Sequence, residues 1–232
     1  MEHVPPASAP LRTAESVTDA MRLQILATEH WSLLAHRSMI WNEIFTRTGM
    51  FLTTVSASLV ALALVAQVTD FGATFRTMAL LVLPVVLFLA VATYIRLVET
   101  MRIDAWTVMG MNRLRHAYIE IAPDLEPYFV TSQYDDVQGM MISAGSTPHM
   151  SVGQVLSGTP VIVAVVCAVI SGVIAALILD GITDRFTIQL AAGLVVTLVV
   201  TVILVVVTPM RSIAAMTTEW KPRFPSPAVP RP

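Results

Sequence analysis

Four long apolar runs without one Asp, Glu, Lys, Arg or His constrain this chain most. They cover residues 49–68, 77–95, 159–179 and 187–207. An α-helix rises 1.5 Å per residue, so about 20 apolar residues cross a hydrocarbon core about 30 Å thick. A composition of 55% hydrophobic and 13% charged residues also suits a bilayer better than one soluble core. Each run is therefore predicted to be a transmembrane helix.

The spacing of the runs predicts an all-α protein built from two transmembrane hairpins, with long helices that extend into the cytoplasm. The expected organisation is a mobile N-terminal tail at 1–15, a cytoplasmic helix at 16–48 that leads into the first span, a hairpin at 49–95, a cytoplasmic helical segment and loop at 96–158, a second hairpin at 159–207, and a proline-rich, mobile cytoplasmic tail at 208–232.

The basic residues predict the orientation. Of 14 lysines and arginines, only Arg76 and Arg185 lie in the short connections within the hairpins, and all the others flank the opposite side. Cytoplasmic flanks carry the excess of basic residues, so both termini are expected in the cytoplasm. Arginine greatly outnumbers lysine, which we interpret as typical of a GC-rich bacterial genome. The expected location is the bacterial inner (plasma) membrane.

The helix expected before the first span carries two apolar stripes at helical spacing. The first consists of Ala20, Leu23, Ala27, Trp31, Leu34, Trp41 and Phe45, and the second of Leu26, Leu33, Ile40 and Ile44. Two stripes predict two neighbours.

The third span carries a stripe of small residues every four positions: Ala164, Ala168, Gly172 and Ala176. Small side chains let two helix backbones approach closely in lipid, so we interpret this stripe as a helix-packing face.

Two uncharged polar stripes are candidates for a pore lining. The fourth span has Gln189, Gly193, Thr197 and Thr201 on one face, and the first span has Gly49, Thr53, Ala57 and Ala61, flanked by Thr54, Ser56 and Ser58. Amide and hydroxyl groups around an axis could serve water or ions. Hydrogen bonding between or within helices explains the same residues, and both interpretations stay open.

The remaining polar features predict little chemistry. The spans lack the ionisable residues of a pump or coupled transporter, no catalytic motif is present, and the net charge of -2 does not favour nucleic acid, so we expect no enzyme, cofactor, metal or nucleic-acid partner. The acidic residues Asp124, Glu126, Asp135 and Asp136 suit either a divalent cation or a solvated loop. Pro84 should kink the second span and is a hinge candidate.

Two stretches carry a family resemblance, LQILATEHWSLLAHRSMIWNEIFTRTGMFLTTVSASLVALALVAQ and GMNRLRHAYIEIAPDLEPYFVTSQYDD. They resemble an uncharacterised family of four-span bacterial integral membrane proteins. That resemblance implies the fold over almost the whole chain and carries over no site. The first hairpin is also similar, more loosely, to the two-span SLATT-type effector domains of bacterial defence, which are thought to form pores. This chain departs from them by adding a second hairpin.

Together these features predict a homo-oligomeric membrane protein that acts as an ion channel or pore. The alternative is a non-conducting scaffold or sensor that recruits a cytoplasmic protein partner. Replacing Thr197 and Thr201 by valine would discriminate the two, because only a channel would change its conductance.

Overall fold

The computed structural model describes residues 18–145 and 158–227, and in these ranges the chain is all-α, as predicted. Four helices are long and apolar enough to cross a membrane. The expected N-terminal tail at 1–15, the end of the central segment at 146–157 and the last residues, 228–232, lie outside the described ranges.

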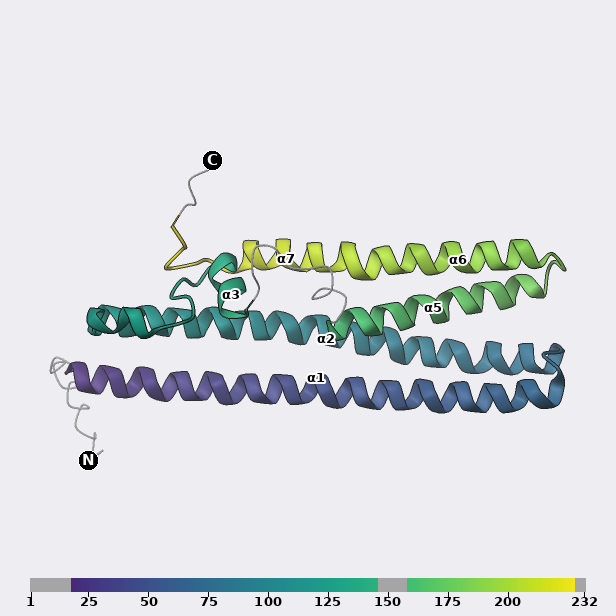
Figure 1. Ribbon diagram of the computed structural model, residues 1–232, viewed down its shortest axis with the longest axis horizontal. Helices are drawn as coiled ribbons and strands as arrows, with labels where there is room; N and C mark the ends of the chain where they lie inside the picture. The colour runs from purple at the N-terminus through teal and green to yellow at the C-terminus, as the bar shows by residue number, and fades with distance from the viewer. Residues whose placement is uncertain (1–17, 146–157, 228–232) are drawn as a thin grey trace, which may run out of the picture.

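The first hairpin consists of α1 (Asp19–Thr69) and α2 (Ala73–Ile121). With 51 and 49 residues, each helix is about 75 Å long and so exceeds any bilayer. Thr18 caps α1 by accepting a hydrogen bond from the Met21 amide, so the helix begins three residues after the expected start at residue 16. Asp70 and Phe71 turn the chain with positive φ angles of 48° and 56°. Both helices therefore continue as one antiparallel pair beyond the membrane on the same side (Figure 1).

The second hairpin consists of α5 (Thr159–Asp180) and α6 (Phe186–Val202). It continues through a π-helical turn, η2 (Ile203–Val207), into α7 (Thr208–Glu219). Residues 208–219 are thus helical, whereas we expected the tail to begin at 208. The difference arises at Pro209, which cannot donate to the helical ladder. The Thr208 amide bonds to the Ile203 carbonyl five residues back, and the helix continues past the proline.

The Leu204 carbonyl receives its hydrogen bond from another helix. In the π register its donor would be residue 209, which is proline and has no N–H. The hydroxyl of Tyr94, buried on α2, donates to this carbonyl instead. One tyrosine therefore satisfies the group that the proline leaves open and joins the two hairpins.

The four long helices lie in one row in the order α1, α2, α5, α6 (Figure 1). A core of buried residues from α1, α2 and α5 joins the row, among them Ile44, Leu97 and Cys167. α2 runs unbroken through Pro84, and a hinge at this residue stays a prediction. Beyond the membrane, η1 (Pro123–Tyr128), α3 (Val137–Ser143) and α7 pack on the end of α2. α1 and α6 form the edges of the row.

Two glycines set the spacing between α5 and α6. A Cβ atom at Gly172 would lie 2.5 Å from the Gly193 carbonyl oxygen, and one at Gly193 would lie 3.3 Å from the Ala176 Cβ. In the small-residue stripe, Ala164, Ala168 and Gly172 are buried. The second hairpin therefore depends on direct backbone contact between its helices.

Replacing Gly172 by alanine should push α5 and α6 apart, because the added methyl meets backbone that cannot give way. Overpacking of this kind costs about 1–3 kcal/mol. Gly49→Ala is the matched control, since nothing lies within 4 Å of a Cβ atom there. Unfolding of both variants in the same detergent measures the difference, and equal stability of the two would contradict the described packing.

Candidate functional site

One side of α1 is left uncovered along its whole length. Outside the apolar run, Trp31, Met39 and Phe45 are 71%, 70% and 63% exposed. The opposite stripe faces α2, where Ile40 and Ile44 are buried. The two apolar stripes of α1 predicted two neighbouring helices. In the part of a single chain that the structure describes, one of these neighbours, α2, is present.

Small and hydroxyl-bearing residues occupy the same side of α1 within the span. Gly49, Thr53, Ser56 and Ala57 are all exposed. The Thr53 hydroxyl donates to the Gly49 carbonyl at 2.9 Å, so its oxygen keeps lone pairs for an incoming donor or cation. Thr54 and Ser58 are half-buried and donate to carbonyls one turn back. This stripe is uncovered in the single chain.

The polar stripe of α6 faces its own hairpin instead. Thr197 lies against Gly172 of α5, beside the contact that buries Gly193. Its hydroxyl donates to the Gly193 carbonyl at 2.9 Å, and Thr201 repeats this bond one turn on at 2.7 Å.

Gln189 lies at the end of the α6 stripe and is held by the turn between the helices. Its amide donates to the Thr183 carbonyl at 2.7 Å and to the Asp180 carboxylate at 3.1 Å. Of the two polar stripes, the one on α1 is therefore the open one.

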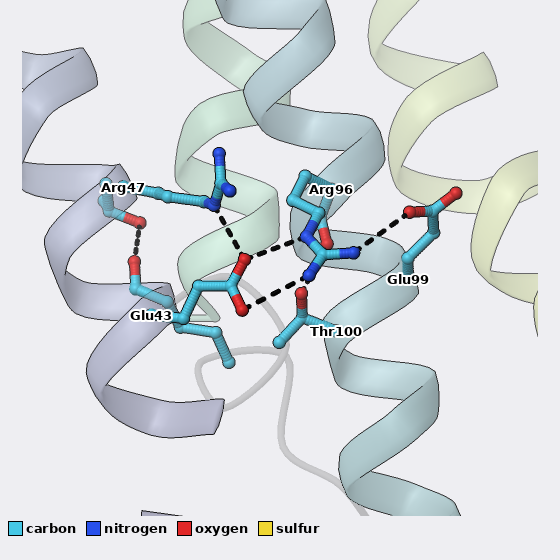
Figure 2. A network of polar contacts seen from close by, with 7 residues as sticks. Glu43, Arg47, Arg96, Glu99 and Thr100 are labelled. Atoms are coloured by element: carbon cyan, nitrogen blue, oxygen red, sulfur yellow. Dashed lines mark hydrogen bonds and ion pairs between the residues drawn. The ribbon is translucent and has the colours of Figure 1, made fainter. Parts of the chain in front are cut away.

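A charged network ties α1 to α2 where their apolar runs begin and end. Glu43 accepts from Arg47 Nε and Arg96 Nε, both at 2.8 Å, and Arg96 also approaches Glu99 at 3.7 Å (Figure 2). The hydrogen bond from Arg96, followed by that from Arg47, lowers the pKa of Glu43. Thr100 donates to the Arg96 carbonyl at 2.7 Å.

A second pair, Arg37 and Asp104 at 2.9 Å, ties the same two helices farther from the membrane. Two ion pairs at different heights fix both the register and the rotation of α1. The uncovered side is therefore turned away from α2 by bonded contacts.

The acidic pair after α2 holds the C-terminal segment. Asp135 is fully buried and accepts from the Arg113 guanidinium at 2.8 Å and from the backbone amides of Arg223 and Phe224 at 3.0 and 2.7 Å. Asp136 caps α3 through the Gly139 amide. The structure thus differs from a solvated loop, which was one of the two interpretations of these residues, because the carboxylates bind partners far away in the sequence.

The held segment is the start of the proline-rich tail. The Trp220 indole donates to the Asp135 carbonyl at 2.7 Å, the Phe224 ring stacks on His116 with centroids 3.8 Å apart, and Ser226 donates to Asp136 through both its amide and its hydroxyl. The proline content had predicted a mobile tail here. Sequence inspection missed that the carboxylates of Asp135 and Asp136 accept hydrogen bonds from backbone N–H groups of this segment.

These contacts leave little room for a metal at the acidic pair. Among residues 18–145 and 158–227, no three His, Cys, Asp or Glu side chains gather to hold an ion. The oxygens of Asp135 and Asp136 are engaged by the tail instead.

A comparison of this chain with models of protein families, with curated proteins and with solved structures finds no match. The resemblance to the four-span bacterial family and the similarity to SLATT-type domains therefore stay predictions. Function has to be argued from the geometry of α1 and its neighbours.

Acidification should release the tail from Asp135. Burial raises the pKa of this carboxyl, but the Arg223 and Phe224 amides and Arg113 outweigh burial and hold the pKa below its ordinary value. Because the pKa of Asp135 is lower in the folded state, its charged form stabilises the docked tail at pH values above the unfolded pKa of about 4. That stability is lost as the pH falls through the folded-state pKa. Amide exchange at Phe224, followed from pH 7 downwards, measures the release.

Asp135→Asn should have a similar effect at neutral pH, since charge-assisted hydrogen bonds contribute about 2 kcal/mol. Asp124→Asn, at an exposed carboxylate, is the control and should leave exchange at Phe224 unchanged. A Phe224 amide that exchanges freely in the unaltered protein at pH 7 would refute the docked tail.

Proposed function

We propose that this chain forms a homo-oligomer in which the uncovered sides of α1 from several copies surround a common axis and line a pore for water or small ions. One observation carries the proposal. The same side of α1 is uncovered along its length, with large apolar groups outside the span and small hydroxyl-bearing residues inside it.

Assembly is supported by the part of α1 outside the hydrocarbon. Charged residues such as Arg37 and Glu43 interrupt this part, so lipid tails do not cover it. Trp31, Met39 and Phe45 would then face water in an isolated chain, at a cost of about 25 cal/mol per Å² of apolar surface. A second copy of the same chain lies in the same membrane and could cover this surface. Clustered exposed aromatic residues are typical of interfaces between protein subunits.

A pore is supported by the part of α1 within the span. Thr53 and Ser56 carry hydroxyl oxygens on the uncovered side, and Gly49 leaves space beside them. On this side Asn42 at the base and Gln67 near the far end are also polar and exposed, while the exposed apolar residues Val60 and Leu64 lie between Thr53 and Gln67. Uncharged oxygens replace part of a hydration shell without trapping an ion. The stripe on α6 has weaker support, because α5 covers it.

The proposal keeps the orientation that the basic residues predict, with both termini in the cytoplasm of a bacterial cell and the chain in its plasma membrane. The protein would act without catalysing a reaction. The charged network around Glu43 would then lie at the cytoplasmic mouth, where fixed charges influence which ions enter.

A second candidate rests on the aromatic part of α1 alone. Trp31 and Phe45 lie outside the span and would also suit a groove on a cytoplasmic protein. In that case the chain is a non-conducting scaffold or sensor. The hydroxyl stripe within the span would then have no role in permeation.

Phe45→Ala should weaken the oligomer, because the aromatic ring supplies apolar contact area between copies. Phe88→Ala is the matched control, since this ring is 71% exposed on the span of α2, where lipid covers it. Mass photometry in nanodiscs measures copy number for both variants. An unaltered protein that is monomeric under these conditions would refute the assembly.

Thr53→Val should lower conductance while leaving assembly intact. The substitution keeps the shape of the side chain and removes its oxygen. In an oligomer it removes a ring of acceptors, each of which contributes about 0.5 kcal/mol to binding of the permeating ion or water. Conductance should therefore fall about twofold or more. Thr201→Val removes an equivalent hydroxyl that bonds one turn back on α6 and should leave conductance unchanged. Planar-bilayer recording compares them. Equal conductance in all three proteins would exclude the α1 stripe as the pore lining, and no conductance in any of them would favour the scaffold.

A further inference from the structure

A cavity of about 220 Å³ lies between α2, the start of α5 and α7, with Met140 of α3 at one end. Its walls are apolar except for Arg102 and Ser212. It is separate from the uncovered side of α1, and the pore proposal does not use it.

We propose that this cavity holds part of one acyl chain of an anionic phospholipid from the adjacent leaflet, with the lipid phosphate bound at Arg102. Three features favour this ligand: the height of the cavity in the membrane, the apolar character of its inner wall and the unused hydrogen-bonding capacity of Arg102.

The height of the cavity matches a lipid. Tyr94 and Leu204, at one end of it, belong to the last turns of the second and fourth apolar runs. Arg102 comes eight residues after Tyr94 on α2, about 12 Å farther along the helix and beyond the apolar run. The cavity therefore extends from the hydrocarbon edge to the level of the phosphates.

The inner wall offers apolar surface. The Tyr94 hydroxyl already donates its hydrogen bond to the Leu204 carbonyl, at the π turn that accommodates Pro209. Val98 and Ile213 complete this end of the cavity. The occupant of the inner part must therefore be a hydrocarbon, and the volume suits part of one chain rather than a whole lipid.

Arg102 has donors to spare at the outer end. Its Nε atom is buried, and no acceptor among the described residues lies within hydrogen-bonding distance of it. Its Nη1 atom forms an ion pair with the Glu219 carboxylate at 3.7 Å, which is too long for a hydrogen bond, and its guanidinium lies over the Trp106 ring at 5.1 Å. A buried unpaired donor is costly, and a phosphate accepts from a guanidinium through two parallel bonds. Charge and geometry thus favour a phosphate.

The test is a lipid titration of the full chain in detergent, followed by native mass spectrometry. The probes are phosphatidylglycerol and phosphatidylcholine with identical acyl chains. We expect tighter binding of phosphatidylglycerol, and about tenfold weaker binding of it by Arg102→Gln. Arg211→Gln removes an exposed arginine of α7 that does not line the cavity and should change the affinity less than twofold.

A second variant tests the cavity without touching the charge. Ala105→Leu narrows the cavity that Ala105 lines and should weaken the binding of both lipids, while Arg102 keeps its preference for phosphatidylglycerol. Thermal unfolding confirms that both variants are folded, and the Ala105 variant decides the question if Arg102→Gln is not.

Three results would overturn the proposal. They are equal affinity for the two lipids in the unaltered protein, equal losses in Arg102→Gln and Arg211→Gln, and unchanged binding in Ala105→Leu. Tighter binding of free dodecanoate than of phosphatidylglycerol would also overturn it, because the ligand would then be a fatty acid and not a leaflet lipid.

Discussion

Hydrocarbon offers no hydrogen bonds, so every peptide group within the membrane has to be satisfied by the protein itself. The four long helices meet this demand through their own ladders. One exception lies at Pro209, where the ladder shifts to a π turn and the Leu204 carbonyl accepts from Tyr94 of another helix. This bond joins the two hairpins, sets the path of α7 and shapes the wall of the cavity beside it. A local defect in one helix thereby becomes a tertiary contact.

The order of the helices in the row follows from which helix surfaces already pack against a neighbouring helix. α5 and α6 meet through backbone at Gly172 and Gly193, and α2 meets α1 through apolar contacts and two interhelical ion pairs. Those contacts use up the inner faces and leave α1 and α6 as edges. An edge helix inside lipid is stable, because lipid tails are as apolar as leucine. An edge helix that continues into water with Trp31 and Phe45 exposed places apolar side chains in a polar solvent. This mismatch between side chains and solvent distinguishes α1 from α6.

Hydropathy and periodicity predicted the spans and the hairpins, because length and side-chain character alone decide what hydrocarbon accepts. They could not predict which helix each stripe would face. The threonines of α6 and those of α1 have the same spacing, yet Gly172 covers Thr197 while Thr53 stays open. Nor could periodicity predict the helix through Pro209, since the residue that rescues it lies on α2. Asp135 looked like a loop carboxylate because its partners Arg223 and Phe224 come 88 and 89 residues later.

The contact between Asp135 and the C-terminal segment also has a consequence for the order in which the molecule is built. Ribosomes make the chain from its N-terminus, so Asp135 emerges long before the amides that it binds. Until Arg223 and Phe224 leave the ribosome, this carboxylate lacks two of its donors and cannot be buried without penalty. The part of the protein outside the membrane is therefore completed last. A chain that stops short of Arg223 would insert its four spans and still carry an unfinished base.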